Sequence, residues 1–221
     1  MRLLLSRHGQ ATWNLQGRYQ GQGDPPLAPE GERQARALAS RLALERIDAV
    51  YASDLQRAAR TAEIVAEGRG LAVVRDAAWR ETSYGEWTGL TGEEIAARDP
   101  AHWERWRADW NTAPPGGETG EDVQRRVVAA AQSLRQRQPN DTVLIVTHAG
   151  PLLVLQCWVA GLPLGSTDAL PSAHGGLSCV RWDDGGPRAE FWNDVSHLAA
   201  PSAVALRPPG APWPGPSGSG T

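Results

Sequence analysis

Arginine and histidine stand side by side at Arg7-His8, directly after the short apolar run Leu3-Leu4-Leu5. That run is typical of a strand covered on both faces, and Gly9 after it permits a tight turn or the close approach of a ligand. Arginine holds phosphate with a planar fork of donors, and a neutral imidazole can attack phosphorus. The pair therefore suggests phosphoryl chemistry at a strand end, with an ordinary surface Arg-His pair as the alternative.

Polar groups of the same kind follow three further strand-like runs, at 47–52, 71–74 and 142–147. The groups are Ser53-Asp54-Leu55-Gln56-Arg57, Arg80-Glu81 and Thr147-His148-Ala149-Gly150. The carboxyl ends of parallel strands share one edge of a sheet, where ligands usually bind. We therefore expect all four groups to converge at one site.

Helical patterns alternate with these runs. They cover residues 29–44, 55–66, 93–98, 102–110, 121–136 and 151–160, and a strand hairpin is expected at 177–182 and 189–193. Ser53-Asp54 is the expected N-cap of the second helix, and the spacing of Trp103, Trp106 and Trp110 favours a packing face over an aromatic binding box. The alternation predicts an α/β fold, a three-layer sandwich with a mainly parallel central sheet and helices on both faces.

The composition is that of an ordinary globular domain, with 41% hydrophobic and 21% charged residues over 221 positions. We expect one domain at 1–198 and a disordered tail, rich in Pro, Gly and Ser, at 199–221. A net charge of −3 without a basic run argues against nucleic acid as a partner, and no apolar stretch is long enough to span a membrane or to act as a signal peptide. Two separate cysteines fit buried thiols in a cytoplasmic protein.

The converging groups match the needs of phosphoryl transfer, in which positioning and charge stabilisation do most of the work. His8 would be the nucleophile, kept neutral by nearby arginines, while Arg7 and Arg57 neutralise the phosphate oxygens and His148 donates a further hydrogen bond. Glu81 would protonate the leaving alkoxide and then activate water. Each of these residues also has a purely structural interpretation: Glu81 could be ion-paired, Arg57 could lie on a helix face and His148 could cap the core. The occurrence of all of them together at strand ends favours the catalytic interpretation.

Several segments in order carry a family resemblance. They are Leu5-Ser6-Arg7-His8-Gly9-Gln10-Ala11-Thr12-Trp13-Asn14, Gly17-Arg18-Tyr19-Gln20-Gly21, Asp24-Pro25-Pro26-Leu27, Ser53-Asp54-Leu55-Gln56-Arg57-Ala58 with Thr61-Ala62, Arg80-Glu81-Thr82-Ser83-Tyr84-Gly85-Glu86-Trp87-Thr88-Gly89, Pro115-Gly116-Gly117-Glu118-Thr119 and Val146-Thr147-His148-Ala149-Gly150. The set, spanning most of residues 3–182, resembles the histidine phosphatase superfamily, also called phosphoglycerate mutase-like.

The resemblance implies the phosphoglycerate mutase-like fold and the same roles for Arg7, His8, Arg57, Glu81 and His148. It adds Asn14, Gln20 and Gly21 as contacts to the phosphate or its leaving group, and Tyr84 as a further substrate-binding candidate. Gln10 departs from the glutamate that many members carry, in a variable part of the signature.

Three functions remain open at this stage. The first is a phosphatase of small phosphorylated metabolites, the second a cofactor-dependent phosphoglycerate mutase, and the third a phospho-ligand-binding module without catalysis. The third predicts a missing nucleophile or acid, yet His8 and Glu81 are both present. The segment between Glu81 and His148 is shorter than in mutases that the chain resembles and contains no lysine, which favours the phosphatase. We expect neither a metal nor a cofactor, because arginines and a histidine replace the cation.

Overall fold

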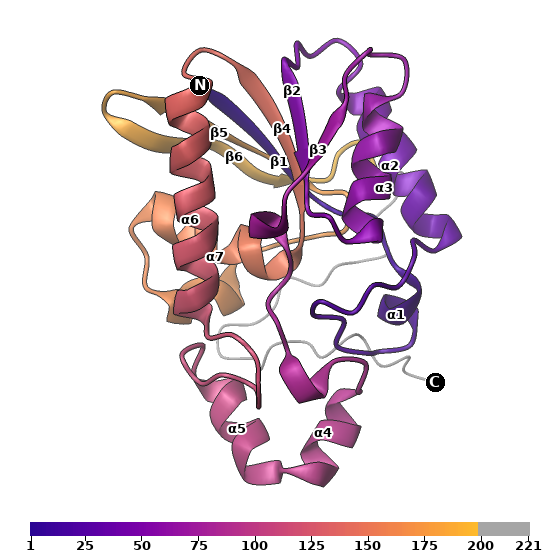
Figure 1. The fold of residues 1–221 in the computed structure, drawn as a ribbon, viewed down its shortest axis with the longest axis vertical. Coiled ribbons are helices and arrows are strands. Elements are labelled where there is room, and N and C mark those ends of the chain that lie inside the picture. The colour runs from indigo at the N-terminus through magenta and orange to yellow at the C-terminus, as the bar shows by residue number, and fades with distance from the viewer. Residues whose placement is uncertain (199–221) are drawn as a thin grey trace.

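Strand β1 (Arg2–Arg7) lies near the middle of a six-stranded sheet whose order is β3-β2-β4-β1-β5-β6 (Figure 1). The computed structural model describes residues 1–198. The other strands are β2 (Ala49–Ala52), β3 (Val73–Arg75), β4 (Thr142–Thr147), β5 (Leu177–Asp183) and β6 (Gly186–Asp194). β1 to β4 run parallel, whereas β5 is antiparallel to β1 and β6 is antiparallel to β5. The carboxyl ends of four strands therefore meet at one edge.

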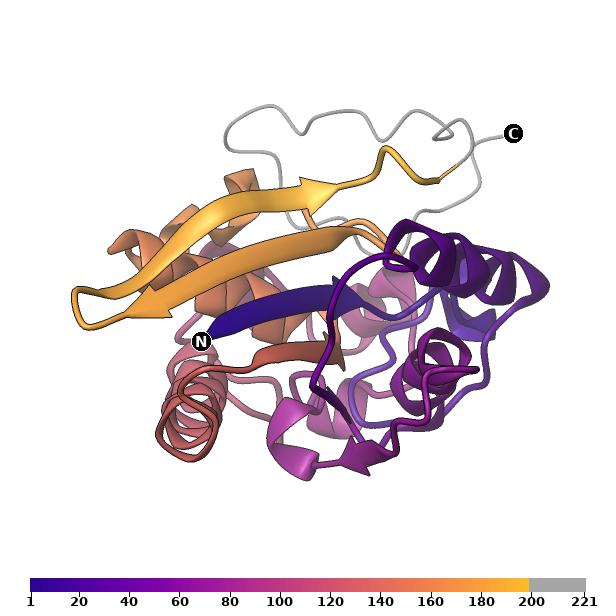
Figure 2. The same ribbon diagram turned by 90° about the horizontal axis from the view of Figure 1, so that it is seen from above.

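Helices cover both faces of this sheet (Figure 2). They are α2 (Pro29–Arg41) and α3 (Gln56–Ala66) on one face, with α6 (Gly120–Arg137) and α7 (Ala149–Ala160) on the other. Successive residues of β1 alternate between the faces: Leu4 packs with α2 and α3, while Leu3 and Leu5 pack with α6 and α7. The predicted three-layer α/β fold with a mainly parallel sheet is confirmed.

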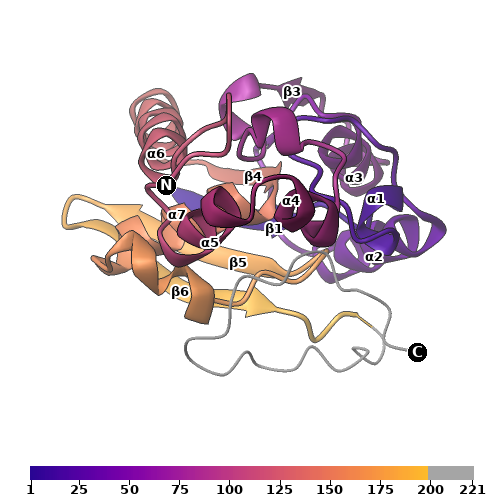
Figure 3. The ribbon, with the colours of Figure 1, turned by 90° about the horizontal axis from the view of Figure 1, so that it is seen from below.

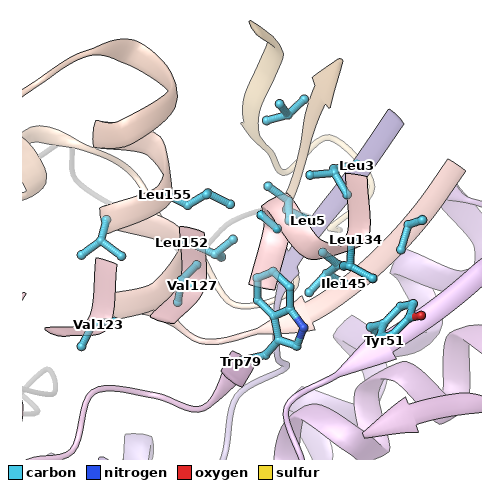
Figure 4. Packing of buried hydrophobic residues seen from close by; sticks show 14 residues of the cluster. Leu3, Leu5, Tyr51, Trp79, Val123, Val127, Leu134, Ile145, Leu152 and Leu155 are labelled. Carbon is cyan, nitrogen blue, oxygen red and sulfur yellow. The ribbon is translucent and has the colours of Figure 1, made fainter. Parts of the chain in front are cut away.

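The core on the α6 and α7 face also fixes the segment that follows β3. Trp79 ends the short 3₁₀ helix η1 (Ala77–Trp79), and only 1% of its surface is exposed among residues such as Leu5 and Ile145 (Figure 4). Thr147 Oγ1 donates a hydrogen bond of 2.7 Å to the Trp79 carbonyl. The start of the segment that carries Glu81 is therefore attached to the end of β4.

Two short helices lie beyond the carboxyl edge of the parallel strands, α4 (Gly92–Arg98) and α5 (Pro100–Ala108) (Figures 1 and 3). Thr91 and Asp99 cap them through side-chain hydrogen bonds to backbone N–H groups. Trp103 is buried in an aromatic cluster whose other members include Tyr19, Tyr84, Trp87 and Trp106. The prediction of a packing face is therefore correct for Trp103, which stacks on Trp106 at 5.3 Å between ring centroids.

The predicted N-cap of the second helix is wrong. α3 begins at Gln56 after an extended Leu55, and no side chain of Ser53 or Asp54 caps it. Asp24, from the loop that follows the short helix α1 (Thr12–Leu15), accepts the Gln56 N–H at 2.7 Å instead. Asp54 is engaged elsewhere, because both of its carboxylate oxygens accept hydrogen bonds from Arg80.

Smaller differences concern boundaries and short turns. The first predicted helix ends at Arg41 rather than 44, and the predicted loop at 77–92 contains the 3₁₀ helices η1 and η2 (Gly85–Trp87). The sequence pattern also did not predict two short helical elements, α1 (Thr12–Leu15) and η3 (Leu164–Ala169). The predicted disordered tail lies outside the described residues. Within residues 1–198, no helix has the length and apolar character needed to cross a membrane.

Candidate active site

His8 and His148 follow neighbouring parallel strands, and the sheet register places their side chains together. Arg7 pairs with Thr147 across β1 and β4, and the His8 N–H donates to the Thr147 carbonyl at 2.9 Å. The two imidazole centroids are 4.9 Å apart, and both rings are buried. The edge of the sheet thus brings together two histidines that are 140 positions apart in the chain.

The tautomer of His8 follows from its hydrogen bonds. Nδ1 lies 2.6 Å from the Gly9 carbonyl, which can only accept, so Nδ1 carries the proton. Nε2 then keeps its lone pair and accepts a hydrogen bond of 3.3 Å from Arg57 Nε. Burial holds the pKa of His8 well below its usual value, and His148, Arg57 and Arg7 lower it further. The ring is neutral at physiological pH and presents a nucleophilic nitrogen.

The backbone at the end of β1 approaches the start of α2 closely. A Cβ on Gly9 would lie 2.2 Å from the Gly31 carbonyl oxygen, so no larger residue fits there. The Gly9 N–H donates to Thr61 Oγ1 at 3.1 Å. The close packing against the start of α2 therefore requires glycine at this position, and it also fixes the Gly9 carbonyl that orients the His8 ring.

Arg57 enters the site from the first turn of α3 and is fully buried. Its two terminal nitrogens donate to the carbonyls of Gly23 at 2.7 Å and Gly21 at 2.8 Å. Gly21 has a φ of +48°, a conformation that glycine adopts without strain. Burial lowers the pKa of Arg57 to about 10, with Glu81 opposing this shift, so the guanidinium stays charged at neutral pH. The glycine-rich loop thus aims a desolvated cation at His8.

Glu81 is 8% exposed and is held by two backbone donors. Its Oε1 accepts the N–H of Thr82 at 2.9 Å and the N–H of Gly150, in the first turn of α7, at 3.0 Å. One carboxylate oxygen is thus fixed by the backbone. Oε2 is left as the oxygen that can exchange a proton with a substrate. The bond from Gly150 joins Glu81 to the helix that His148 begins.

Arg126 of α6 braces the Glu81 segment, a role that the sequence did not reveal. It donates to the carbonyls of Ala78, Arg80 and Glu81 at 2.7 to 3.0 Å. The guanidinium also forms a two-pronged pair with Glu118, at 2.8 and 3.0 Å. Glu118 in turn accepts the Ser83 N–H at 2.8 Å. Residues on either side of Glu81 are therefore bound to one half-buried ion pair.

The remaining predicted residues line the same region in different ways. Asn14 Oδ1 accepts the Ala11 N–H at 2.9 Å. The amide N–H₂ of Asn14 therefore points away from Ala11 and can donate to an acceptor. Gln20 is buried, and Gly21 orients Arg57 through its carbonyl. Tyr84 packs edge-on against Tyr19 at 5.1 Å between ring centroids. It lines a small cleft, which the histidines and Arg7 and Arg57 do not line, together with Thr82, Trp106, Arg107, Trp110, Glu118, Gly120 and Asp168.

Two residues differ from the prediction: Arg80 lies outside the site, and His174 lies inside it. Arg80, which follows the third strand, turns away and pairs with Asp54 at 2.5 to 2.7 Å. His174 was not predicted, yet its ring centroid lies 5.7 Å from that of His8. His174 precedes β5, which runs antiparallel to β1 and therefore begins at the edge where the parallel strands end.

Buried polar atoms without a hydrogen-bond partner gather around His8. Within residues 1–198 they include Arg7 Nε, both ring nitrogens of His148 and Nε2 of His174. Burial also holds the pKa of His148 well below its usual value, so this ring is neutral and carries one N–H. Buried polar groups are nearly always paired in native proteins. These unpaired atoms, close to the guanidinium charges of Arg7 and Arg57 that act on His8, therefore indicate a site for a small anion. Within residues 1–198, no cluster of His, Cys, Asp and Glu side chains could hold a metal ion.

The model of the histidine phosphatase superfamily (branch 1) matches residues 3–195. The chain belongs to this superfamily. The resemblance noted in the sequence is confirmed, as is the prediction of a phosphatase enzyme. Phosphoserine phosphatase 1 of Hydrogenobacter thermophilus is 35% identical over 165 residues, covering 74% of this chain and 78% of that protein. The structure of Bacillus stearothermophilus YhfR aligns with a TM-score of 0.86 and 36% identity, over 90% of this chain and 99% of that one.

Other members of the superfamily differ in length and in the activity that their names give. A bifunctional protein of Mycobacterium tuberculosis is 44% identical over 155 residues, which is 70% of this chain and 43% of that protein, so the chain spans less than half of that relative. A probable phosphoglycerate mutase of Cronobacter sakazakii is 33% identical over 217 residues, covering 94% of this chain and 99% of that protein.

Proposed function

We propose that this chain hydrolyses phosphate monoesters of small metabolites through a covalent phosphohistidine at His8. The observation that carries the proposal is the ring of buried, unpartnered polar groups around an imidazole whose Nε2 is unprotonated. An anion of the size and charge of a phosphoryl group would satisfy Arg7, His148 and His174 together. We place the enzyme in the cytoplasm, a location that suits its two free, buried cysteines.

In the first step the phosphoryl group of the substrate binds between Arg7, Arg57 and His148. The Nε–H of Arg57 turns from His8 Nε2 to a phosphoryl oxygen, which frees the nitrogen lone pair. That lone pair forms the new N–P bond while the bond between phosphorus and the ester oxygen breaks. Glu81 gives its proton to the departing oxygen, so the product leaves as a neutral alcohol and the carboxylate remains.

In the second step water attacks the phosphorus of the phosphohistidine. Glu81, now ionised, takes a proton from that water, and the N–P bond breaks with its electron pair returning to His8 Nε2. Inorganic phosphate is released and both groups regain their starting protonation states. His148 begins α7, so the partial positive charge of the helix N-terminus adds to the two guanidinium charges near the phosphate.

Phosphoglycerate mutase is the second candidate, favoured by the relatedness of the chain to the probable mutase of Cronobacter sakazakii. A mutase must hold a bisphosphorylated intermediate and exclude water from it, which requires a second cationic subsite beside the first. Arg107 lines the cleft next to Tyr84, but it is paired with Glu104 at 3.0 Å and lies over the Trp103 ring. This pairing lowers the positive charge available to a second phosphate, so hydrolysis is the function that the site supports better.

The test compares hydrolysis and isomerisation in one preparation. Release of inorganic phosphate from phosphorylated sugars, glycerates, nucleotides and amino acids is measured alongside interconversion of 3- and 2-phosphoglycerate, with and without 2,3-bisphosphoglycerate. We expect hydrolysis of the best substrate to exceed isomerisation. Isomerisation that is far faster and depends on the bisphosphate would establish the mutase instead. His8→Gln should abolish either activity, whereas the matched control His102→Gln, outside the site, should keep it.

A further inference from the structure

His174 lies in the segment before β5, and its ring faces the proposed nucleophile. The centroids of His174 and His8 are 5.7 Å apart, with their planes inclined by 56°. Nε2 of His174 is buried and has no hydrogen-bond partner. A polar atom in this position, next to the reacting nitrogen, requires an explanation that packing alone does not provide.

The segment around His174 is fixed to the phosphate site itself. The Gly175 N–H donates to the Arg7 carbonyl at 3.0 Å, and the Arg7 guanidinium donates to the Ser172 carbonyl at 2.7 Å. Ala173 is held from the other side, because its N–H donates to Asn193 Oδ1 at 2.7 Å. His174 is therefore placed by contacts to β1 and β6, and its position is coupled to that of Arg7.

The surroundings of His174 decide which kind of partner Nε2 needs. The charged groups that act electrostatically on His174 are Arg7 and Arg57, which can only donate hydrogen bonds. Burial holds the pKa of His174 well below its usual value, and these two arginines lower it further. The ring is therefore neutral and carries one N–H. With that proton on Nε2, the acceptor comes from a bound ligand, and the ligand proposed for this site is the phosphoryl group.

We propose that His174 is a further catalytic residue, which donates its Nε2–H to a phosphoryl oxygen in the bound substrate and during transfer to His8. The proposal rests on the proposed function, because it concerns the same phosphoryl group. The donor stabilises charge on the oxygens without adding a third cation to the pocket. It also lies on the side of His8 toward β5, whereas His148 follows β4, so the two neutral histidines contact the anion from different strands.

Glutamine and methionine offer a matched pair of replacements. Both side chains are unbranched and close in volume to histidine, but only glutamine retains an N–H donor. His174→Gln and His174→Met are compared with the unaltered protein and with His102→Gln, whose ring lies outside the site against Trp87. Circular dichroism and thermal unfolding establish that each variant is folded, and His174→Ala replaces the methionine variant if that one is not.

Two quantities are measured: the Kd for orthovanadate by calorimetry, and kcat/KM for p-nitrophenyl phosphate. A hydrogen bond to a charged acceptor corresponds to roughly a tenfold effect or more. We expect His174→Met to weaken orthovanadate binding and lower kcat/KM by about tenfold or more, and His174→Gln to recover most of both.

Two results would overturn the proposal. The first is that a folded methionine or alanine variant, which lacks the donor, keeps the Kd for orthovanadate and kcat/KM within twofold of the unaltered protein. The other is an equal loss in the glutamine and methionine variants, which would assign His174 to packing. Orthovanadate binding does not require turnover, so the proposal is tested even if the unaltered protein fails to hydrolyse phosphate esters, a result that would refute the proposed function alone.

Discussion

Gly150 is the position where one added methyl group should separate the acid role of Glu81 from the rest of the site. A Cβ at Gly150 would lie 2.5 Å from Glu81 Oε1 and 2.5 Å from Thr82 Oγ1. Ordinary contact begins at 3.4 Å, so the carboxylate must move by about 3.4 − 2.5 = 0.9 Å. This movement also lengthens the hydrogen bond from the Gly150 N–H, which is 3.0 Å long.

The size of the effect follows from that displacement. A misplacement of about 1 Å in a catalytic group costs on the order of a hundredfold in rate. Alanine is favoured over glycine within helices by about 1 kcal/mol, which offsets part of the strain in α7, so the folded state should survive. We therefore expect Gly150→Ala to lower kcat/KM for alkyl phosphates about a hundredfold. p-Nitrophenolate leaves without needing a proton from Glu81. Its release from p-nitrophenyl phosphate in the first turnover should therefore proceed at nearly the original rate.

The assay measures steady-state hydrolysis of an alkyl phosphate and the burst of p-nitrophenolate by stopped flow. Gly165→Ala is the matched control, because a Cβ there meets no atom within 4 Å. The reasoning is refuted if Gly150→Ala retains full activity on the alkyl phosphate. It is equally refuted if the burst and the alkyl phosphate reaction slow by the same factor, because the loss would then not depend on protonation of the leaving group.

Three further predictions concern the chemistry of the pocket. Glu81→Gln should slow hydrolysis of alkyl phosphates by roughly a hundredfold or more and affect the p-nitrophenolate burst much less; equal losses in single-turnover measurements would contradict the acid role. Exhaustive chelation should leave the rate unchanged, since arginines and histidines supply the charge stabilisation; loss with EDTA and recovery with Mg²⁺ would contradict this. Burial lowers the pKa values of His8, His148 and His174 in the folded protein. Below the ordinary imidazole pKa of about 6.5, the unfolded state therefore binds more protons than the folded state. The free energy of unfolding should then fall as the pH decreases below about 6.5, by up to ~1.4 kcal/mol per pH unit for each histidine. Chemical denaturation between pH 7 and 5 measures this slope, and His174→Gln should reduce it by about one proton.

The strand-end groups could be predicted because their positions depend on local sequence and one general rule. Arg7-His8 and His148 directly follow apolar runs, and parallel strands end at a shared edge. The cap of α3 could not be predicted, because the acceptor of the Gln56 N–H is Asp24, which is 32 positions away in the chain. The local candidate Asp54 is paired with Arg80 instead, a tertiary contact that no local pattern encodes.

Arg126 and His174 were missed for different physical reasons. Arg126 lies on a helix at a position where an exposed arginine is expected, and its contacts depend on how α6 packs beside the Glu81 segment. No local pattern encodes that packing. His174 precedes a strand instead of following one, and it belongs to the site only because β5 runs antiparallel to β1. The direction of β5 is set by sheet topology, which the hairpin pattern alone left open.

Trapping the phosphoenzyme tests the central claim most directly. Rapid acid-free quench with a ³²P-labelled substrate, followed by peptide mapping, measures both the stability of the label and its position. The account predicts a label that is acid-labile and alkali-stable, located on His8, and lost in His8→Gln but retained in His102→Gln. A label on another residue, or full turnover by His8→Gln, would contradict it.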